Sequence, residues 1–290
     1  MNVYEIVTGK LIAALERGTV PWRRPWRGAD GAPRNLASGK SYRGINALLL
    51  GLAGYSSPTW GTINQINAAG GRVRRGERST LVVFWRRLEV EETDADGDKV
   101  LRHPSMIRYY LVFNTDQCDG LKMPAPTGGD PAPVEPLAAG LAVVAGMPNP
   151  PEIVTGGRAC YVPVEDRVEM PESARFVNAP EYYSTLFHEL AHSTGHEKRL
   201  NRKGITETAR FGDAVYSREE LIAEMAASFV CADVGIEHEL EQSAAYLASW
   251  IKALKGDARL AVTAAGQAQK AADYILNRPN IAGQSAGQGA

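Results

Sequence analysis

Residues 124–136 constrain the fold most strongly, because they cannot form a helix or a central strand. The segment PAPTGGDPAPVEP places five prolines and a glycine pair in thirteen residues. Proline has no amide hydrogen and a fixed φ, so such a run forms a stiff, extended linker. We therefore expect a first domain over residues 1–123, a proline-rich linker over 124–136 and a second domain over 137–278. Residues 279–290, rich in Gly, Ala, Gln and Ser, are expected to be a disordered tail.

The composition is that of a globular protein. Hydrophobic residues make up 44% and charged residues 22% of the 290-residue chain, which excludes a disordered polymer. No run of about 18 apolar residues is present, so we expect no helix that spans a membrane. The three cysteines, Cys118, Cys160 and Cys231, are far apart. They indicate neither a disulfide framework nor a zinc knuckle, and they suit a reducing cytoplasm.

Apolar periodicity predicts an α+β fold with two unlike halves. The first is mixed: helices near residues 3–17 and from Gly44 accompany two strands rich in β-branched and aromatic residues, 80–88 and 106–114. The acidic stretch 89–99 is expected to be the loop between these strands. The second half is expected to be mostly helical with a small sheet. Its predicted strands are 158–164 and 167–170, and its predicted helices are 134–145, 180–195, 218–234, 240–254 and 257–277.

The run HELAH at residues 188–192 predicts a metal centre. His188 and His192 are four residues apart on a predicted helix, so their imidazoles lie on one face and can reach one ion. Glu189, beside the first histidine, is the expected general base that takes a proton from an activated water. We expect Zn²⁺, although Mn²⁺ and Co²⁺ also suit two histidines and a carboxylate.

The third ligand has two candidates. His196 lies too far along a straight helix to share an ion with His188, unless the chain turns after Gly195. Glu224 lies in an apolar stretch of the next predicted helix, where a carboxylate needs a compensating partner, and it is the preferred candidate. Ser217 and Glu220 fit the S-x-x-E capping box, which assigns Glu220 to the start of that helix.

Positive charge and aromatic rings gather in the first half. Residues 1–88 hold 14 Lys and Arg against 4 Asp and Glu, whereas residues 126–290 hold 14 against 21. Arginine pairs with phosphates and flat rings stack on unpaired bases, so this half is predicted to bind single-stranded nucleic acid. The candidate contacts are Trp22, Arg23, Arg24, Trp26, Arg27, Arg34, Arg43, Trp60, Arg72, Arg74, Arg75 and Arg78, to which Tyr42, Tyr55, Trp85, Tyr109 and Tyr110 add further rings.

Several motifs together resemble one family. They are PRN at 33–35, YRGIN at 42–46, Trp60 with Gln65, GGRVRRGE at 70–77, VFNTDQ at 112–117, HELAHSTGH at 188–196 and EELIAE at 219–224. With these motifs the chain resembles the ArdC-type antirestriction proteins of conjugative plasmids, and the N-terminal part of TraC-type primases. The resemblance covers nearly all of residues 1–278.

The resemblance implies an N-terminal domain that binds single-stranded DNA and a C-terminal zincin-like metallopeptidase domain. It also implies that the protein protects incoming plasmid DNA from host restriction endonucleases during conjugation. By position, it implies His188, His192 and Glu224 as metal ligands and Glu189 as the catalytic glutamate. It does not fix what, if anything, is hydrolysed.

Three functional hypotheses follow. The first is a DNA-binding antirestriction protein with an active peptidase domain, whose partners are single-stranded DNA and a host restriction enzyme or other host protein. The second is a protein that coats single strands and uses the metal only to brace the fold. The third is a zinc metallopeptidase that acts on a host protein and uses the basic domain for recruitment. Single-strand affinity that falls steeply with salt separates the first two from the third.

Overall fold

The computed structural model describes residues 2–23, 31–87, 90–93, 99–102, 105–121, 136–202, 214–236, 238 and 244–279. Its fold is α+β, with a mixed N-terminal half and a mostly helical C-terminal half that carries a small sheet, as predicted. The predicted linker up to Glu135, and the tail from Asn280, lie outside the described residues. The division at 124–136 therefore stays a prediction. Within the described part, no helix combines the length and the apolar character needed to cross a membrane.

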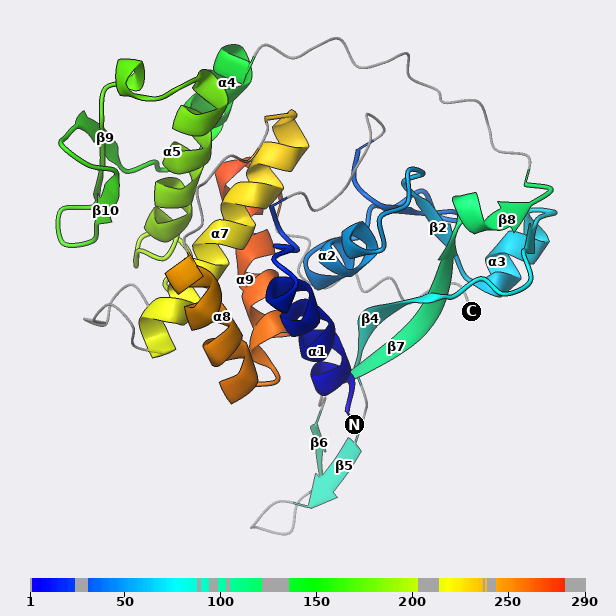
Figure 1. The fold of residues 1–290 in the computed structure, drawn as a ribbon. Helices are drawn as coiled ribbons and strands as arrows, with labels where there is room; N and C mark the ends of the chain where they lie inside the picture. The colour runs from blue at the N-terminus through cyan, green and yellow to red at the C-terminus, as the bar shows by residue number, and fades with distance from the viewer. Residues whose placement is uncertain are drawn as a thin grey trace.

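The helical part is organised around α7 (Ala214–Val234), which lies between α5 and α9 and also contacts α8 (Figure 1). The first helix, α1 (Val3–Glu16), packs against α8 and α9 from the far end of the sequence. Asn2 and Glu5 form a reciprocal capping box that fixes its start. The remaining helices of this part are α4 (Pro136–Gly146), α5 (Ala179–Ser193), α8 (Ala244–Gly256) and α9 (Leu260–Ile275).

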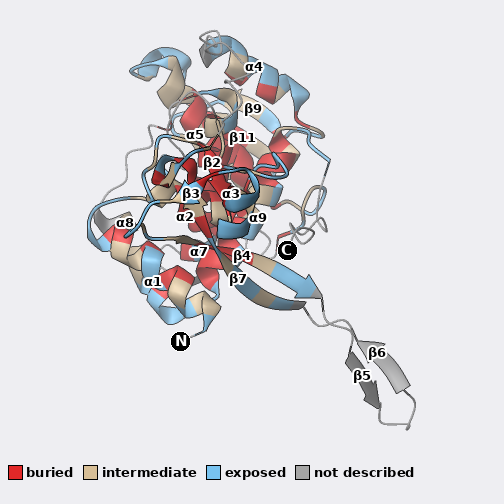
Figure 2. Ribbon diagram, turned by 90° about the vertical axis from the view of Figure 1, so that its right-hand side faces the viewer, coloured by how far each residue is buried: buried red, intermediate tan, exposed pale blue. Residues whose placement is uncertain are grey.

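One continuous hydrophobic core joins the two halves of the sequence. Leu11 of α1 and Trp22 belong to the same buried cluster as Leu190 of α5 and Trp250 of α8. Figure 2 shows the buried residues gathered along the helices and at the inner end of the sheet, with exposed residues around them. The N-terminal segment is therefore held to the helical part by apolar packing.

The N-terminal sheet has the strand order β1-β2-β7-β4. All of β4 (Thr80–Arg87) pairs antiparallel with the first eight residues of β7 (Ser105–Asn114), which confirms both predicted strands. Between them lies a second ribbon, where we had expected a loop: β5 (Val90–Thr93) pairs with β6 (Lys99–Arg102). The other elements of this half are β1 (Arg34–Asn35), α2 (Ile45–Leu52), β2 (Thr59–Gly61), α3 (Ile63–Ala68), β3 (Arg72–Val73) and β8 (Cys118–Asp119).

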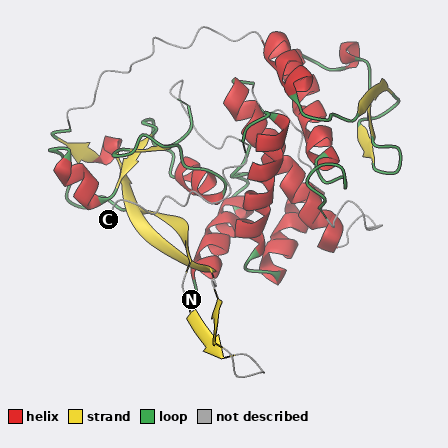
Figure 3. Cartoon of the chain, turned by 180° about the vertical axis from the view of Figure 1, so that it is seen from behind, coloured by secondary structure: helices red, strands yellow, loops and turns green. Residues whose placement is uncertain are grey.

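A three-stranded sheet lies beside α5, on the outer side of the helical part (Figure 3). It has the order β10-β11-β9, so β10 (Cys160–Val162) is an edge strand. The predicted pair is confirmed as β10 and β11 (Arg167–Met170), whereas β9 (Glu152–Thr155) was not predicted. This sheet brings β10 against the helix that carries the HELAH run.

Candidate metal centre and basic surface

Helix α5 positions the two histidines. The Asn178 side chain accepts a hydrogen bond from the backbone N–H of Glu181 at 2.7 Å, and Pro180 follows in the first turn, so the helix start is well defined. One turn apart near the other end, His188 and His192 bring their Nε2 atoms to 3.1 Å from each other. That spacing suits two nitrogens that share one ion.

Glu220 of α7 completes the group. Its two carboxylate oxygens lie 3.5 Å from the Nε2 atoms of His188 and His192. Ligand atoms of these three residues all lie within 4.8 Å of one another. Two imidazoles and one carboxylate fit a divalent cation and leave a coordination position open, which is the arrangement of catalytic sites.

Two further glutamates of α7 face the opposite nitrogens of the same rings. Glu224 Oε1 lies 3.7 Å from His188 Nδ1, and Glu219 Oε1 lies 3.6 Å from His192 Nδ1. Glu224 therefore lies on the far side of the ring from the shared nitrogen pair. The geometry favours Glu220 over the predicted Glu224 as the third ligand. Glu224 is placed to orient the imidazole of His188.

The helix boundary explains the difference. The capping box at Ser217 and Glu220 requires that the helix begin at Ser217, but α7 begins at Ala214. Ser217 is already inside the helix, so it does not cap the helix start and the capping interpretation of Glu220 is wrong. The sequence does hold a signal that could have identified Glu220 as a candidate ligand. Glu220 and Glu224 are four residues apart, so on one continuous helix they lie one turn apart on the same face.

His196, the alternative ligand, lies away from this group. Helix α5 ends at Ser193, and His196 Nδ1 faces Asp166 Oδ2 at 3.8 Å. Asp166 also accepts a hydrogen bond from Tyr161 Oη at 2.9 Å and pairs with Arg199, whose side chain is fully buried. These contacts tie the turn between β10 and β11 to the segment that follows α5.

Glu189 lies between α5 and the edge strand β10. Glu189 is 9% exposed, and its carboxylate accepts a hydrogen bond from the backbone N–H of Tyr161 at 2.8 Å. The bond holds the carboxylate beside the histidines but outside the ligand group. A carboxylate in this position can take a proton from a water molecule at the open coordination site.

The electrostatics of the group favour a cation. Burial alone would lower the pKa of His188, but the contact with Glu220 and the charges of Glu224 and Glu189 raise that pKa to about 9. Burial alone would raise the pKa of Glu219, but His192 and Arg202 lower it. The carboxylates around the two imidazoles thus stabilise a positive charge placed at this site.

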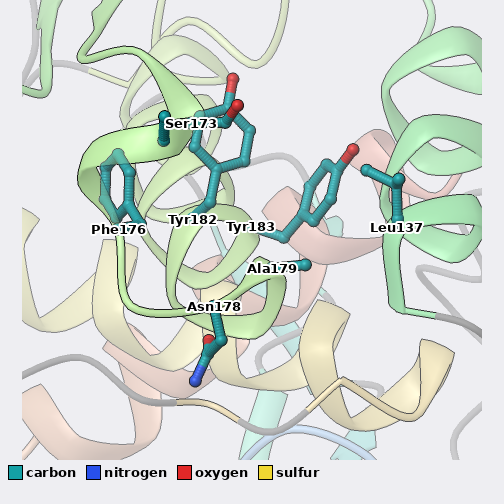
Figure 4. A pocket seen from close by; sticks show the side chains of 8 residues that line it. Leu137, Ser173, Phe176, Asn178, Ala179, Tyr182 and Tyr183 are labelled. Atoms are coloured by element: carbon teal, nitrogen blue, oxygen red, sulfur yellow. The ribbon is translucent and has the colours of Figure 1, made fainter.

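The hollow in Figure 4 is separate from this centre. It has a volume of about 450 Å³ and is lined by Leu137, Ser173, Ala174, Phe176, Asn178, Ala179, Tyr182 and Tyr183. These residues surround the start of α5, whereas His188 lies roughly 13 Å further along the helix axis. No ligand group for a metal lies among them.

Two of the predicted stacking residues are core residues. Trp22 is fully buried and packs edge-on against Trp250 with ring centroids 5.2 Å apart. Trp60 is 2% exposed and packs edge-on against Tyr55 at 5.5 Å. A base needs an open ring face, so the prediction that Trp22 and Trp60 stack on DNA is wrong.

The predicted arginines separate into three groups. Arg23, Arg34, Arg72, Arg75 and Arg78 are exposed, so they can meet a polyanion. Arg74 is also exposed but bonds to Glu77 and to the backbone oxygen of Asp116. Arg43 pairs with Asp273 of α9, which gives it a structural contact between the two halves. Arg24, Trp26 and Arg27 lie outside the described residues.

Comparisons with known families identify the class of each half. Residues 151–267 match the zincin-like metallopeptidases, and residues 1–113 match the N-terminal domain of the anti-restriction factor ArdC. The metal centre and the C-terminal sheet fall inside the first match, and the sheet that contains β4 and β7 falls inside the second except for Asn114, the last residue of β7. The chain belongs to the ArdC antirestriction family.

The relatives agree with this assignment along almost the whole chain. The crystal structure of the antirestriction ArdC protein from plasmid R388, in metal-free form, is 38% identical with a TM-score of 0.76, over 95% of this chain and 97% of that chain. Its Mn(II)-bound form gives a TM-score of 0.75. Protein y4eC of Sinorhizobium fredii is 38% identical over 94% of this chain and 91% of its own length. The DNA primases TraC of Escherichia coli are 38% and 37% identical, but the chain spans only 27% and 20% of their lengths.

Proposed function

We propose that this protein binds single-stranded DNA and protects incoming plasmid DNA from host restriction, and that it carries a divalent-metal centre of the metallopeptidase type. The observation that carries the proposal is the group of His188, His192 and Glu220 beside Glu189. Family membership supports the antirestriction role, and the charge of residues 1–88 supports the DNA partner. A host restriction enzyme or another host protein is the proposed protein partner.

The proposed ligands are His188 and His192 through Nε2, together with the Glu220 carboxylate. Zn²⁺ is the proposed ion, with Mn²⁺ and Co²⁺ as alternatives that the same donors accept. The related R388 structure with Mn(II) supports a site of this broader specificity. When bound, a divalent cation supplies Lewis acidity that polarises a carbonyl and lowers the pKa of water.

The residues of the chain have separate tasks in this proposal. Glu189 acts as general base, and the Tyr161 N–H keeps its carboxylate pointed at the site. Glu224 and Glu219 lie 3.7 and 3.6 Å from Nδ1 of His188 and His192, so their charges would favour a proton on Nδ1 and would leave Nε2 to hold a metal. Arg202 holds Glu219 by a buried ion pair and so fixes the second of these contacts.

A peptidase that acts on a host protein, with the basic half used for recruitment, is the second candidate. One observation favours it: β10 lies at the edge of its sheet and directly beside Glu189. An extended peptide can add to a sheet edge by backbone hydrogen bonds, which would bring a scissile bond near the base. A salt-sensitive affinity for single-stranded DNA separates the two candidates, because recruitment of a protein does not require it.

The test compares restriction of incoming plasmid DNA in cells that carry the wild type, Glu189→Gln or Glu197→Gln. Glu197 is exposed and follows the same helix, so it serves as the matched control. Bound metal is measured for each purified variant and should be unchanged. If the wild type and the control protect while Glu189→Gln does not, hydrolysis belongs to the mechanism. Equal protection by all three assigns the function to DNA binding, and an unprotected wild type overturns the proposal.

A further inference from the structure

One face of the β4–β7 ribbon runs from the core into solvent. In the antiparallel register, Leu81 lies opposite Leu111, Val83 opposite Tyr109 and Trp85 opposite Ile107, so these six side chains share a face. Leu81 and Val83 are buried, but Trp85 is 42% exposed and Tyr109 and Leu111 are each 48% exposed. Large apolar groups are therefore exposed on this face, at Tyr109 and Leu111 of β7 and at Trp85 of β4.

The position of the Trp85 ring is fixed from one side. The ring of Tyr4 lies 6.3 Å away at an angle of 58°, and the guanidinium of Arg259 lies over Tyr4 at 5.6 Å. These contacts come from α1 and from the start of α9, so the helical part holds Trp85 in place. A ring that is already oriented loses little conformational entropy when a flat partner stacks on it.

The two strands that carry these rings are positively charged. Strands β4 and β7 contain Arg86, Arg87 and Arg108 and no acidic residue. Arg86 and Arg108 are exposed and lie on the opposite face, where Arg86 is paired with Met106 and Arg108 with Phe84. Within the described residues the ribbon is only two strands wide here, so long arginine side chains can reach around its edges.

We propose that Trp85 and Tyr109 form the surface on which bases of single-stranded DNA stack, with Arg86 and Arg108 bound to the phosphates. The inference rests on the proposed DNA-binding function and names the surface that performs it. Open rings beside arginines fit a single strand, because the bases of a duplex are already stacked on one another. The surface replaces Trp22 and Trp60, whose rings are buried.

The experiment measures affinity for a labelled oligothymidylate, longer than the ~4–16 nucleotides that such surfaces cover, and for the matching duplex. Trp85→Ala and Tyr109→Ala should each weaken single-strand binding on the order of tenfold, since each removes one stacked base. Tyr109→Phe keeps the ring and should recover most of that loss. Leu141→Ala, which truncates an exposed apolar residue of α4, is the matched control.

Salt dependence separates stacking from charge. Trp85→Ala should leave the slope of log affinity against log salt unchanged, because it removes no phosphate contact. Arg86→Gln should lower the magnitude of that slope by about 0.7, the value for one phosphate contact on a single strand. A thermal melt of each variant shows whether it is folded, and Trp85→Leu, which also removes the ring, serves in place of Trp85→Ala if the latter is not.

The outcomes separate the inference from the proposed function. If the wild type fails to bind single strands, the proposed function itself is overturned. If the wild type binds and both alanine variants bind as tightly, the DNA binds to another surface of the protein. That result contradicts the stacking surface but not the proposed function. Equal affinity for duplex and single strand, or capture of an extended peptide in place of DNA, also overturns the stacking surface.

Discussion

The side chains of the metal centre are held by buried partners, whereas most arginines of the N-terminal half face solvent. His188 and His192 are each 12% exposed and touch three glutamates of one neighbouring helix. Arg72 lies in the short strand β3, and Arg75 and Arg78 lie between β3 and β4; all three are exposed. Buried polar groups must be paired, so the side chains of the metal centre can adopt few other conformations. Exposed charges are solvated by water in almost any conformation, so the arginines are less constrained.

Two tryptophans of the N-terminal half differ in the same way, since Trp60 is buried and Trp85 is partly exposed. Substitution of each by alanine tests this difference. Trp60→Ala should lower the free energy of unfolding by about 3–5 kcal/mol, because it leaves a cavity in the core. Trp85→Ala should lower it by less than about 1 kcal/mol, since much of its ring already faces solvent. Urea unfolding of both variants gives the two values. Similar losses for both would mean that Trp85 is a core residue and would remove the basis for a stacking surface.

Glu220 and Glu224 provide the next test within the buried centre. A structural zinc site of four ligands gives about 10–16 kcal/mol, so one ligand contributes on the order of 3 kcal/mol. Glu220→Ala should therefore weaken metal binding by a factor of about 100 to 1000. Glu224→Ala should weaken it by about 10- to 100-fold, as expected for a residue that orients a ligand. Metal affinities are measured by competition with a chelator, and the reverse order would restore Glu224 as the third ligand.

Asp166 and Arg199 test whether the β10–β11 turn depends on a buried charge. Asp166→Asn should lower the free energy of unfolding at pH 7 by about 2–3 kcal/mol, somewhat less than for fully buried pairs because Asp166 is 18% exposed. Lys255→Gln removes an exposed ion pair with Glu16 and should cost at most about 0.5 kcal/mol. Urea unfolding at pH 7 measures both.

The same pair predicts a dependence on pH. Burial alone would raise the pKa of Asp166, but Arg199 and Tyr161 lower it below its ordinary value. A carboxyl whose pKa is lower in the folded protein stabilises the fold above its unfolded pKa, and this contribution is lost as the pH falls through the folded value. The difference in stability between the wild type and Asp166→Asn should therefore shrink below about pH 4. A difference that stays constant in acid would mean that Arg199 does not depend on this carboxylate.

The sequence predicted elements where local spacing decides the structure. The start of α5 at Asn178, the spacing of His188 and His192, and strands β4 and β7 all follow from residues close together in the chain. Glu220 was assigned to a helix cap because the helix was predicted to start at residue 218, four residues after the observed start of α7 at Ala214. Helix ends are set by caps and tertiary contacts more than by periodicity, and this error in the helix start gave Glu220, now the proposed third ligand, a structural role.

Local spacing in the sequence could not predict whether an individual tryptophan is buried or exposed. Trp22 is covered by Trp250 and by α7, where Ser228 donates a hydrogen bond to the Trp22 backbone oxygen. These partners come from the other end of the sequence, and composition does not indicate which aromatic residues they cover. Charge excess belongs to a whole segment, so it supports a polyanion as partner without identifying the residues that touch it.

The smallest effect is expected for the exposed arginines, and it tests whether the N-terminal half works as one charged surface. Single substitutions Arg72→Gln, Arg75→Gln and Arg78→Gln should each lower the salt slope of single-strand binding by about 0.7, with only a few-fold loss of affinity. Arg218→Gln, an exposed arginine of α7, is the matched control and should change neither. If a variant with all three substitutions lowers the slope by the sum of the three single effects, each side chain contacts its own phosphate. An unchanged slope would mean that these three arginines contact no phosphate, which leaves the charge dependence to other exposed arginines such as Arg86 and Arg108.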